Sequence, residues 1–183
     1  MKAVRPSAPD GTTRNGLYRG AQAGRWERIA RGIYLPADAP PADWDQIEAA
    51  TRRRDATICL TSALSYYDLT DTIPEALDVA IPSDARRPAS TGAIRWHRFD
   101  RATFELGRME ILIPGTEQRI GLYSAERTIA DAFRLRGTVG YETARDALKE
   151  WLRRGGKPAK LAEIATQLPR TKAPVMSALD MVA

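Results

Sequence analysis

The chain has few of the residues that disulfide and metal chemistry require. Among 183 residues there is one cysteine, Cys59, and one histidine, His97. A single cysteine excludes an internal disulfide framework, which is typical of a reducing compartment and predicts a cytoplasmic protein. A lone histidine with no cysteine partner makes a zinc site implausible. We interpret Cys59, within the apolar run 57–60, as a small buried side chain, and His97 as a structural or surface residue.

Long apolar runs are missing as well. No stretch approaches the roughly 18 apolar residues that a membrane span needs, and the N-terminus has no apolar signal-peptide core. We therefore expect neither a membrane contact nor a signal peptide. The hydrophobic fraction of 43% is still enough for a core, and 183 residues fit one domain or one domain with a small module.

Sequence signatures of common enzyme chemistry are absent too. There is no glycine-rich dinucleotide loop, and Gly156-Lys157 is followed by a proline rather than by the residues of a P-loop. No Gly-x-Ser-x-Gly elbow and no Asp-x-Lys or Glu-x-Lys tripeptide occurs. We interpret the acidic residues between positions 68 and 84 as turn and surface groups. The sequence therefore predicts a protein that is not an enzyme, with no catalytic residues, no cofactor and no bound metal.

The positive charge is concentrated at the N-terminus. The net charge is +5, and residues 1–35 hold seven basic and two acidic side chains, an excess of five. Residues 36–183 hold 21 side chains of each sign. A basic segment joined to a neutral remainder indicates a contact with a polyanion, with a solvated basic arm as the alternative.

The first 36 residues predict part of a small DNA-binding module. Residues 1–13 lack periodicity and predict a disordered arm. Residues 14–24 predict a short helix in which Leu17 and Ala21 face inward and Gly24 forms the stop. Residues 26–30 and 33–35 predict a two-stranded ribbon. Helix, glycine stop and ribbon form the closing half of a winged helix-turn-helix, so residues 14–36 predict a partial one.

Residues 42–183 predict a single α+β domain after a proline-marked linker. In its first half we expect a helix over 44–54 capped by Asp43, with Trp44, Ile47 and Ala50 buried. A short helix over 60–67 follows, with Thr61 or Ser62 as its N-cap. Three segments then predict strands: a half-buried strand over 77–82, a strand over 93–99, and a hairpin over 108–113 and 118–123.

The second half of this domain predicts helices. Ser124 can cap a helix that carries an Arg127–Asp131 ion pair on its surface. Apolar stripes predict three more helices that start near Tyr141, Pro158 and Ala173. We therefore predict an α+β fold, with a small mixed β-sheet, packed helices and a helical C-terminal half. The partial winged helix, a helix plus a β-ribbon wing, precedes it.

Three segments, in this order, resemble the AbiEi family of antitoxins from type IV toxin–antitoxin systems. Residues 17–35 are similar to the end of a recognition helix and the wing in that family. Residues 60–82 (from Leu-Thr-Ser-Ala-Leu-Ser-Tyr-Tyr through Leu-Asp-Val-Ala-Ile-Pro) resemble the helix–turn–strand unit of the antitoxin domain. Residues 123–133 resemble its strand, serine and helix, with an arginine before a threonine and an aspartate three residues later.

The resemblance implies an antitoxin that counteracts an AbiEii-type toxin, a nucleotidyltransferase-like protein, without needing to form a stable complex with it. It also implies an N-terminal module that represses the shared operon by binding operator DNA, in a setting of abortive phage defence. On this interpretation basic residues of the module contact DNA phosphates: Arg14, Arg19, Arg25, Arg28 and Arg31. Two alternatives remain, namely an antitoxin domain without DNA binding and an enzyme with an unrecognised active site.

Overall fold

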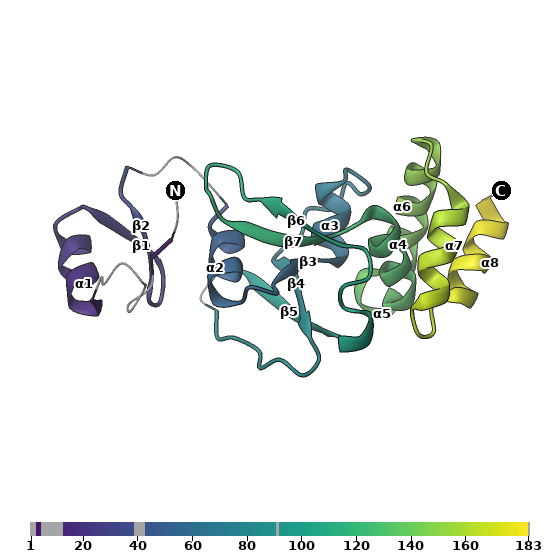
Figure 1. The fold of residues 1–183 in the computed structure, drawn as a ribbon. Coiled ribbons are helices and arrows are strands. Elements are labelled where there is room, and N and C mark those ends of the chain that lie inside the picture. The colour runs from purple at the N-terminus through teal and green to yellow at the C-terminus, as the bar shows by residue number, and fades with distance from the viewer. Residues whose placement is uncertain (1–2, 5–12, 39–42, 91, 183) are drawn as a thin grey trace.

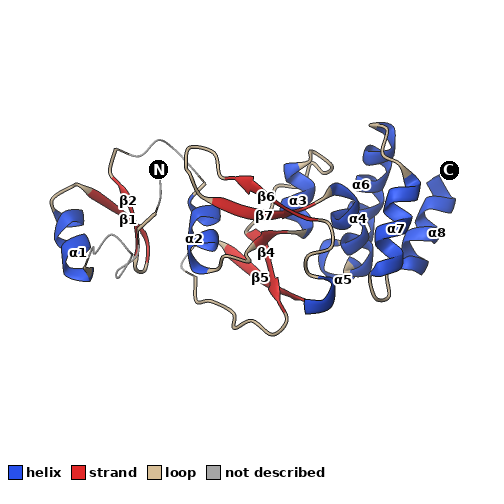
Figure 2. Cartoon of the chain, viewed as in Figure 1, coloured by secondary structure: helices blue, strands red, loops and turns tan. Residues whose placement is uncertain are grey.

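The computed structural model describes residues 3–4, 13–38, 43–90 and 92–182. Figure 1 shows three parts in a row. A helix and a two-stranded ribbon lie at one end, a mixed sheet lies in the middle, and a group of helices forms the other end. The predicted α+β class, with its mixed sheet and helical C-terminal half, is confirmed, as the colouring by secondary structure in Figure 2 makes plain.

The N-terminal part consists of α1 (Arg14–Gln22), β1 (Trp26–Ala30) and β2 (Ile33–Pro36), which we call the helix–ribbon module. The side chain of Thr13 accepts a hydrogen bond from the Gly16 amide and caps α1. Strands β1 and β2 pair antiparallel. A Cβ on Gly20 would lie 2.5 Å from Cδ1 of Trp26, so glycine lets α1 approach the ribbon closely.

The body of the protein, residues 43–182, begins with α2 (Trp44–Arg52) and a five-stranded sheet of order β5-β4-β3-β7-β6. The strands β4 and β5 pair in parallel, as do β3 and β7, whereas β3–β4 and β6–β7 pair antiparallel. The elements of this region, in chain order, are β3 (Thr57–Ile58), α3 (Leu60–Tyr66), β4 (Leu77–Pro82), β5 (Ile94–Phe99), the 3-10 helix η1 (Arg101–Thr103), β6 (Arg108–Leu112) and β7 (Arg119–Tyr123).

Each face of the sheet carries its own apolar cluster. One face carries Ile58, Val79 and Leu122, which share an apolar cluster with Ile47 of α2 and Ile33 of the ribbon. The module is thus joined to the body by a common core, with α2 between ribbon and sheet (Figure 1). The opposite face carries a second cluster that includes buried aromatic and sulfur side chains: Cys59, Phe99, Phe104 and Tyr123.

The C-terminal half is helical and has its own core. Its elements are α4 (Ala125–Arg134), α5 (Arg136–Val139), α6 (Tyr141–Arg153), α7 (Pro158–Gln167) and α8 (Lys172–Val182). Ser124 accepts a hydrogen bond from the Arg127 amide and caps α4 as predicted. Ile129 and Phe133 of α4 pack with Leu148 of α6, Leu161 of α7 and Val175 of α8, and all five are fully buried.

Several local predictions were wrong. Trp44 is 42% exposed, and Glu48 is buried in its place on α2. Neither Thr61 nor Ser62 caps α3; its N-cap is Cys59, without a side-chain bond. The strand β4 is buried on both faces rather than half-buried, because Val79 and Ile81 pack in the cluster on one face of the sheet and Ala80 packs in the cluster on the other. The two-residue strand β3 was not predicted, since its run 57–60 continues directly into α3.

The predicted disordered arm, residues 1–13, lies largely outside the described residues. Of its described members, Val4 forms an isolated antiparallel bridge with Tyr34, and the Ala3 amide donates to Oε1 of Gln118 at 3.2 Å. Ala3 itself is buried and belongs to the core shared by the ribbon and the sheet.

Candidate nucleic-acid interface

The predicted phosphate-contacting arginines stand on three parts of the helix–ribbon module. Arg19 lies in the last turn of α1, Arg25 follows that helix, and Arg28 and Arg31 belong to β1 and the ribbon turn. All four are exposed. Arg14 is the first residue of α1, and its side chain lies outside the described part of the structure. The module therefore presents several guanidinium groups to solvent.

Two of these arginines meet a third from the body. A hollow of about 730 Å³ is bordered by Arg28 and Arg31 of the ribbon and Arg52 at the end of α2. We call it the arginine hollow; the rest of its lining is Asn15, Tyr18, Gly32, Tyr34 and Ala89. Among the described arginines of the module, Arg19 and Arg25 lie outside this lining. The structure thus adds Arg52, which the sequence analysis did not include among the binding residues.

The position of Arg52 is set by buried contacts. Its Nε donates to Oε1 of Glu48 at 2.6 Å, one turn earlier on α2, and Glu48 is only 2% exposed. Glu48 Oε2 in turn accepts the amide of Gly92 at 2.9 Å. On the ribbon, Nε of Arg28 donates to the carbonyl of Ala30 at 3.4 Å. Glu48 therefore orients the Arg52 guanidinium while it links α2 to the loop before β5.

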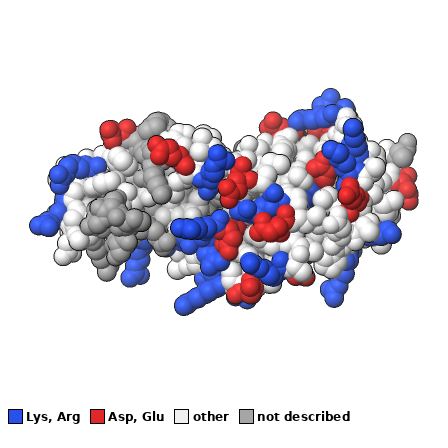
Figure 3. All heavy atoms as spheres, viewed as in Figure 1, with Lys and Arg blue, Asp and Glu red and all other residues white. Residues whose placement is uncertain are grey.

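Charge is unevenly distributed over the surface. On the face drawn in Figure 3, basic side chains stand at the outer end of the helix–ribbon module, and acidic side chains also lie on this part of the molecule. Over the sheet and the helical half, basic and acidic side chains alternate. This distribution follows the charge excess of residues 1–35. The excess positive charge of this segment favours the approach of an anion.

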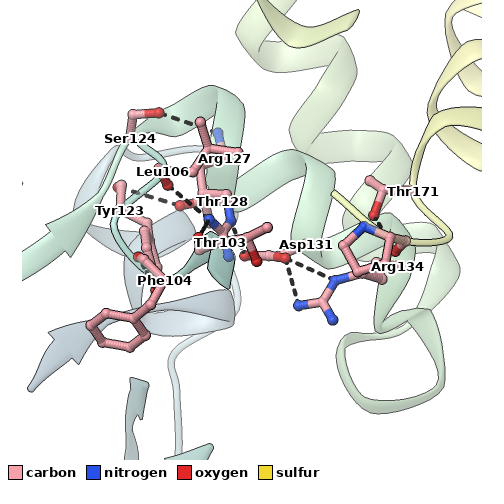
Figure 4. Close-up of polar contacts among 11 residues, drawn as sticks. Thr103, Phe104, Leu106, Tyr123, Ser124, Arg127, Thr128, Asp131, Arg134 and Thr171 are labelled. Carbon is pink, nitrogen blue, oxygen red and sulfur yellow. Dashed lines mark hydrogen bonds and ion pairs between the residues drawn. The ribbon is translucent and has the colours of Figure 1, made fainter. Parts of the chain in front are cut away.

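The second polar feature is buried. Arg127 and Asp131 were predicted to pair on the surface of their helix; they do pair, at 2.7 Å, but both side chains are 1% exposed. Figure 4 shows Arg127 pointing from α4 toward η1 and the turn that follows it, where Nη1 donates to the carbonyls of Thr103 and Leu106, each at 2.7 Å. Asp131 also accepts a hydrogen bond from Nη2 of Arg134 at 2.7 Å. The prediction of a surface pair was wrong because α4 is covered on this side by η1 and the sheet.

In the same region, two arginine guanidinium groups lie close to aromatic rings. The Arg127 guanidinium carbon lies 4.4 Å from the ring centre of Tyr123, and that of Arg134 lies 5.2 Å from the ring centre of Phe99. The hydroxyl of Tyr123 donates to the carbonyl of Phe104 at 2.9 Å. Burial raises the pKa of Tyr123 far above its ordinary value, so the phenol stays a hydrogen-bond donor. No buried side-chain nitrogen or oxygen of the described residues in this cluster is without a hydrogen-bond partner, which indicates a structural role.

A smaller polar contact crosses β4 and β5. Nε2 of His97 lies 2.8 Å from Oδ1 of Asp78, and Arg95 lies 3.5 Å from the same oxygen. Asp78 is 3% exposed, so its prediction as a turn or surface acid was wrong. His97 is a structural residue in this arrangement, in agreement with the sequence analysis. Cys59 is fully buried, and that burial raises the pKa of its thiol.

Two acidic hollows lie elsewhere on the body. One, of about 330 Å³, has Asp43, Asp45 and Glu75 in its lining. Burial and the neighbouring Asp43 carboxylate raise the pKa of Asp45. The other, of about 560 Å³, lies between the turn after α3 and helix α6. Within the described residues, no three histidine, cysteine or acidic side chains are grouped so as to hold a metal ion.

Comparisons with known proteins give no family assignment. No protein-family model matches the chain, and no curated protein matches it. None of the helices in the described part of the chain has the length and apolar character needed to cross a membrane.

Proposed function

We propose that this protein is an antitoxin of a type IV toxin–antitoxin system that also represses its own operon by binding DNA. The observation that carries the proposal is the helix–ribbon module, which has the order and pairing of the closing half of a winged helix and presents exposed arginines. The segment resemblance to AbiEi antitoxins supplies the class. The role is non-enzymatic and belongs to the cytoplasm.

The proposed DNA contact uses the phosphate backbone. Exposed arginines on a helix end and a ribbon supply affinity and register, while base edges would be read by α1 residues. Arg19, Arg25, Arg28 and Arg31 stand at separate points of the module. Neutralising several phosphates releases counterions, so binding is steeply salt-dependent.

The body, on this proposal, counteracts an AbiEii-type nucleotidyltransferase-like toxin encoded beside it, without a stable complex. Support comes from residues 60–82 and 123–133, which carry the resemblance and form the α3–β4 unit and the β7–α4 unit at the centre of the body. The buried Arg127–Asp131 pair lies within the second of these units. The parts of these segments in α3, β4 and α4 are largely buried, whereas residues 71–73 of the intervening turn are exposed.

The DNA-binding part is tested by fluorescence anisotropy with the chain's own upstream duplex and a scrambled duplex, over a salt series. We expect preference for the upstream duplex and an affinity that falls steeply with salt. Arg25→Gln should reduce the salt slope by about one, as expected when one phosphate contact is lost. Arg145→Gln, on the exposed side of α6, is the matched control. Equal binding of both duplexes with a shallow salt slope would refute repression.

The antitoxin part is tested by co-expression with the neighbouring toxin gene. We expect wild-type protein to restore growth. A variant with glutamine at positions 19, 25, 28 and 31 should lose DNA binding and still restore growth, because the body has its own core. Protection by a wild-type chain that shows no preference for the upstream duplex would favour the second candidate, an antitoxin domain that acts without DNA. Failure of the wild-type chain to protect would exclude the antitoxin function.

A further inference from the structure

The arginine hollow contains aromatic and amide side chains that a contact with the DNA backbone does not require. Its lining combines three arginines with two tyrosines and an asparagine, and none of the described residues that line it is acidic. Its volume of about 730 Å³ lies within the range of small-molecule sites, roughly 300–1,000 Å³. A flat phosphate contact needs no such concavity, so the hollow fits a discrete ligand.

The two tyrosines provide aromatic surface. Tyr18 of α1 is 55% exposed although its ring borders the hollow, and its hydroxyl accepts a hydrogen bond from Gln22 at 3.0 Å. Tyr34 of β2 is 4% exposed and forms part of the wall. Asn15 precedes Tyr18 by one helical turn and therefore lies on the same face of α1. Exposed aromatic rings stack on nucleobases, and an amide can hydrogen-bond a base edge.

The three arginines provide the anion site. Arg28 and Arg31 come from the ribbon, and Arg52 comes from α2, where Glu48 orients it. Guanidinium groups bind phosphate oxygens in a bidentate manner and stay charged at every physiological pH. Because the three groups come from two separate parts of the fold, they border the hollow on different sides. A ligand with several phosphate oxygens can contact more than one of them.

We propose that the arginine hollow binds a nucleoside polyphosphate, with the phosphates on Arg28, Arg31 and Arg52 and the base against Tyr18. The regulatory part of this inference, an effect of the nucleotide on operator binding, rests on the proposed DNA-binding function. Arg28 and Arg31 serve both ligands, so a bound nucleotide withdraws them from DNA. The nucleotide therefore acts as an effector that weakens operator binding.

The test measures binding of ribose-labelled ATP and GTP to the full-length protein by fluorescence anisotropy. Unlabelled ATP, tripolyphosphate and adenosine serve as competitors. We expect saturable binding, competition by ATP, weaker competition by tripolyphosphate and little by adenosine. Arg31→Gln and Tyr18→Ala should each weaken binding about tenfold or more, the size expected for one lost charge-assisted contact or one lost stack. Tyr18→Phe should keep nearly full affinity, because it keeps the ring.

The matched control is Arg25→Gln, which removes an exposed arginine of the module outside the hollow. It should leave nucleotide affinity unchanged. Absence of saturable binding would overturn the proposal. An equal loss of nucleotide affinity in Arg25→Gln and Arg31→Gln would also overturn it, because it would indicate a diffuse attraction between charges. The same holds if tripolyphosphate competes as well as ATP and Tyr18→Ala has no effect on nucleotide affinity. Tyr18 and Arg31 are exposed, and thermal melts monitored by circular dichroism check that the variants fold.

The two proposals can fail separately. Under the DNA proposal Arg25→Gln lowers operator affinity, whereas under the nucleotide proposal it is silent. Nucleotide binding without operator preference would refute repression and support the nucleotide proposal. Operator binding without nucleotide binding would support repression and refute the nucleotide proposal. If both bind, excess ATP should lower operator affinity in the wild type and have no effect in the Arg31→Gln, Tyr18→Ala double variant.

Discussion

Arg127 and Asp131 form a buried ion pair of 2.7 Å, one turn apart on α4, with both side chains 1% exposed. The pair ties three parts of the body together. Arg127 donates to two carbonyls of the η1 segment and lies over the Tyr123 ring of β7, while Asp131 holds Arg134. A Cβ on Gly107 would lie 2.8 Å from Cβ of Arg127, so the loop approaches the arginine closely.

Loss of the arginine should therefore destabilise the whole body. We expect Arg127→Gln to lower the free energy of unfolding by about 3–5 kcal/mol, because Oδ2 of Asp131 and two backbone carbonyls lose the Arg127 guanidinium while they remain buried. Urea unfolding followed by circular dichroism measures the change. Arg145→Gln, which removes a solvent-exposed pair with Asp146, should leave the midpoint unchanged. A loss below about 1 kcal/mol for Arg127→Gln would contradict the assignment of this pair as a structural centre.

Ser62 has a role in the sheet rather than at a helix cap. Its hydroxyl accepts the buried amide of Asp78 at 2.8 Å. Ser62→Ala leaves that amide without its partner, so we expect a loss of about 1–3 kcal/mol in unfolding free energy. Ser65→Ala, one turn later on α3, is the control and should change stability much less. Similar losses in both variants would contradict a specific role for the hydrogen bond between the Ser62 hydroxyl and the Asp78 amide.

The thiol of Cys59 should be unreactive in the folded protein. Burial raises its pKa, so at pH 8 the reactive thiolate is scarce, and the side chain is also shielded from reagents. We expect almost no reaction with a thiol-specific disulfide reagent at pH 8 without denaturant, and stoichiometric reaction in concentrated urea. Fast reaction of the native protein would show that the sheet opens around β3 under native conditions.

We expect the contribution of Glu150, near the C-terminal end of α6, to folding stability to depend on pH. Hydrogen bonds from Arg153 and Arg154 lower its pKa to about 2, below the ordinary value of 4.5. A lowered native pKa means that the stabilisation is complete above the unfolded value and is lost as the pH falls from about 4.5 toward 2. The stability difference between wild type and Glu150→Gln should therefore be present at pH 6 and fade over that range.

An NMR titration of the Glu150 carboxyl group checks the same point directly. Its midpoint should lie near pH 2 in the wild type and move up toward 4.5 when Arg153 and Arg154 are both replaced by glutamine. Arg153 and Arg154 are exposed and Glu150 is partly exposed, so added salt should reduce the shift in the pKa of Glu150. A midpoint near 4.5 in the wild type would mean that these hydrogen bonds do not persist in solution.

The local elements were predictable because their signals are local. Asp43 before α2 and Ser124 before α4 each accept a first-turn amide, as predicted. Thr13 does the same before α1, although the sequence analysis placed it in the disordered arm. The α1 helix, the ribbon and the β6–β7 hairpin also follow from glycine stops and alternation within a few residues. The interior strand β3 was missed because it is two residues long and its pairing with β4 and β7 joins distant parts of the chain.

Some features of the candidate site likewise follow from the sequence, and others depend on tertiary packing. The sequence by itself determined that the excess positive charge lies in the first 35 residues and that Arg28 and Arg31 belong to a ribbon. Only the tertiary structure decided that Arg52 joins them around one hollow and that Arg127 and Asp131 are buried. The physical reason is that burial and the meeting of side chains depend on which elements pack together, and a helical pattern specifies a face without specifying what covers it.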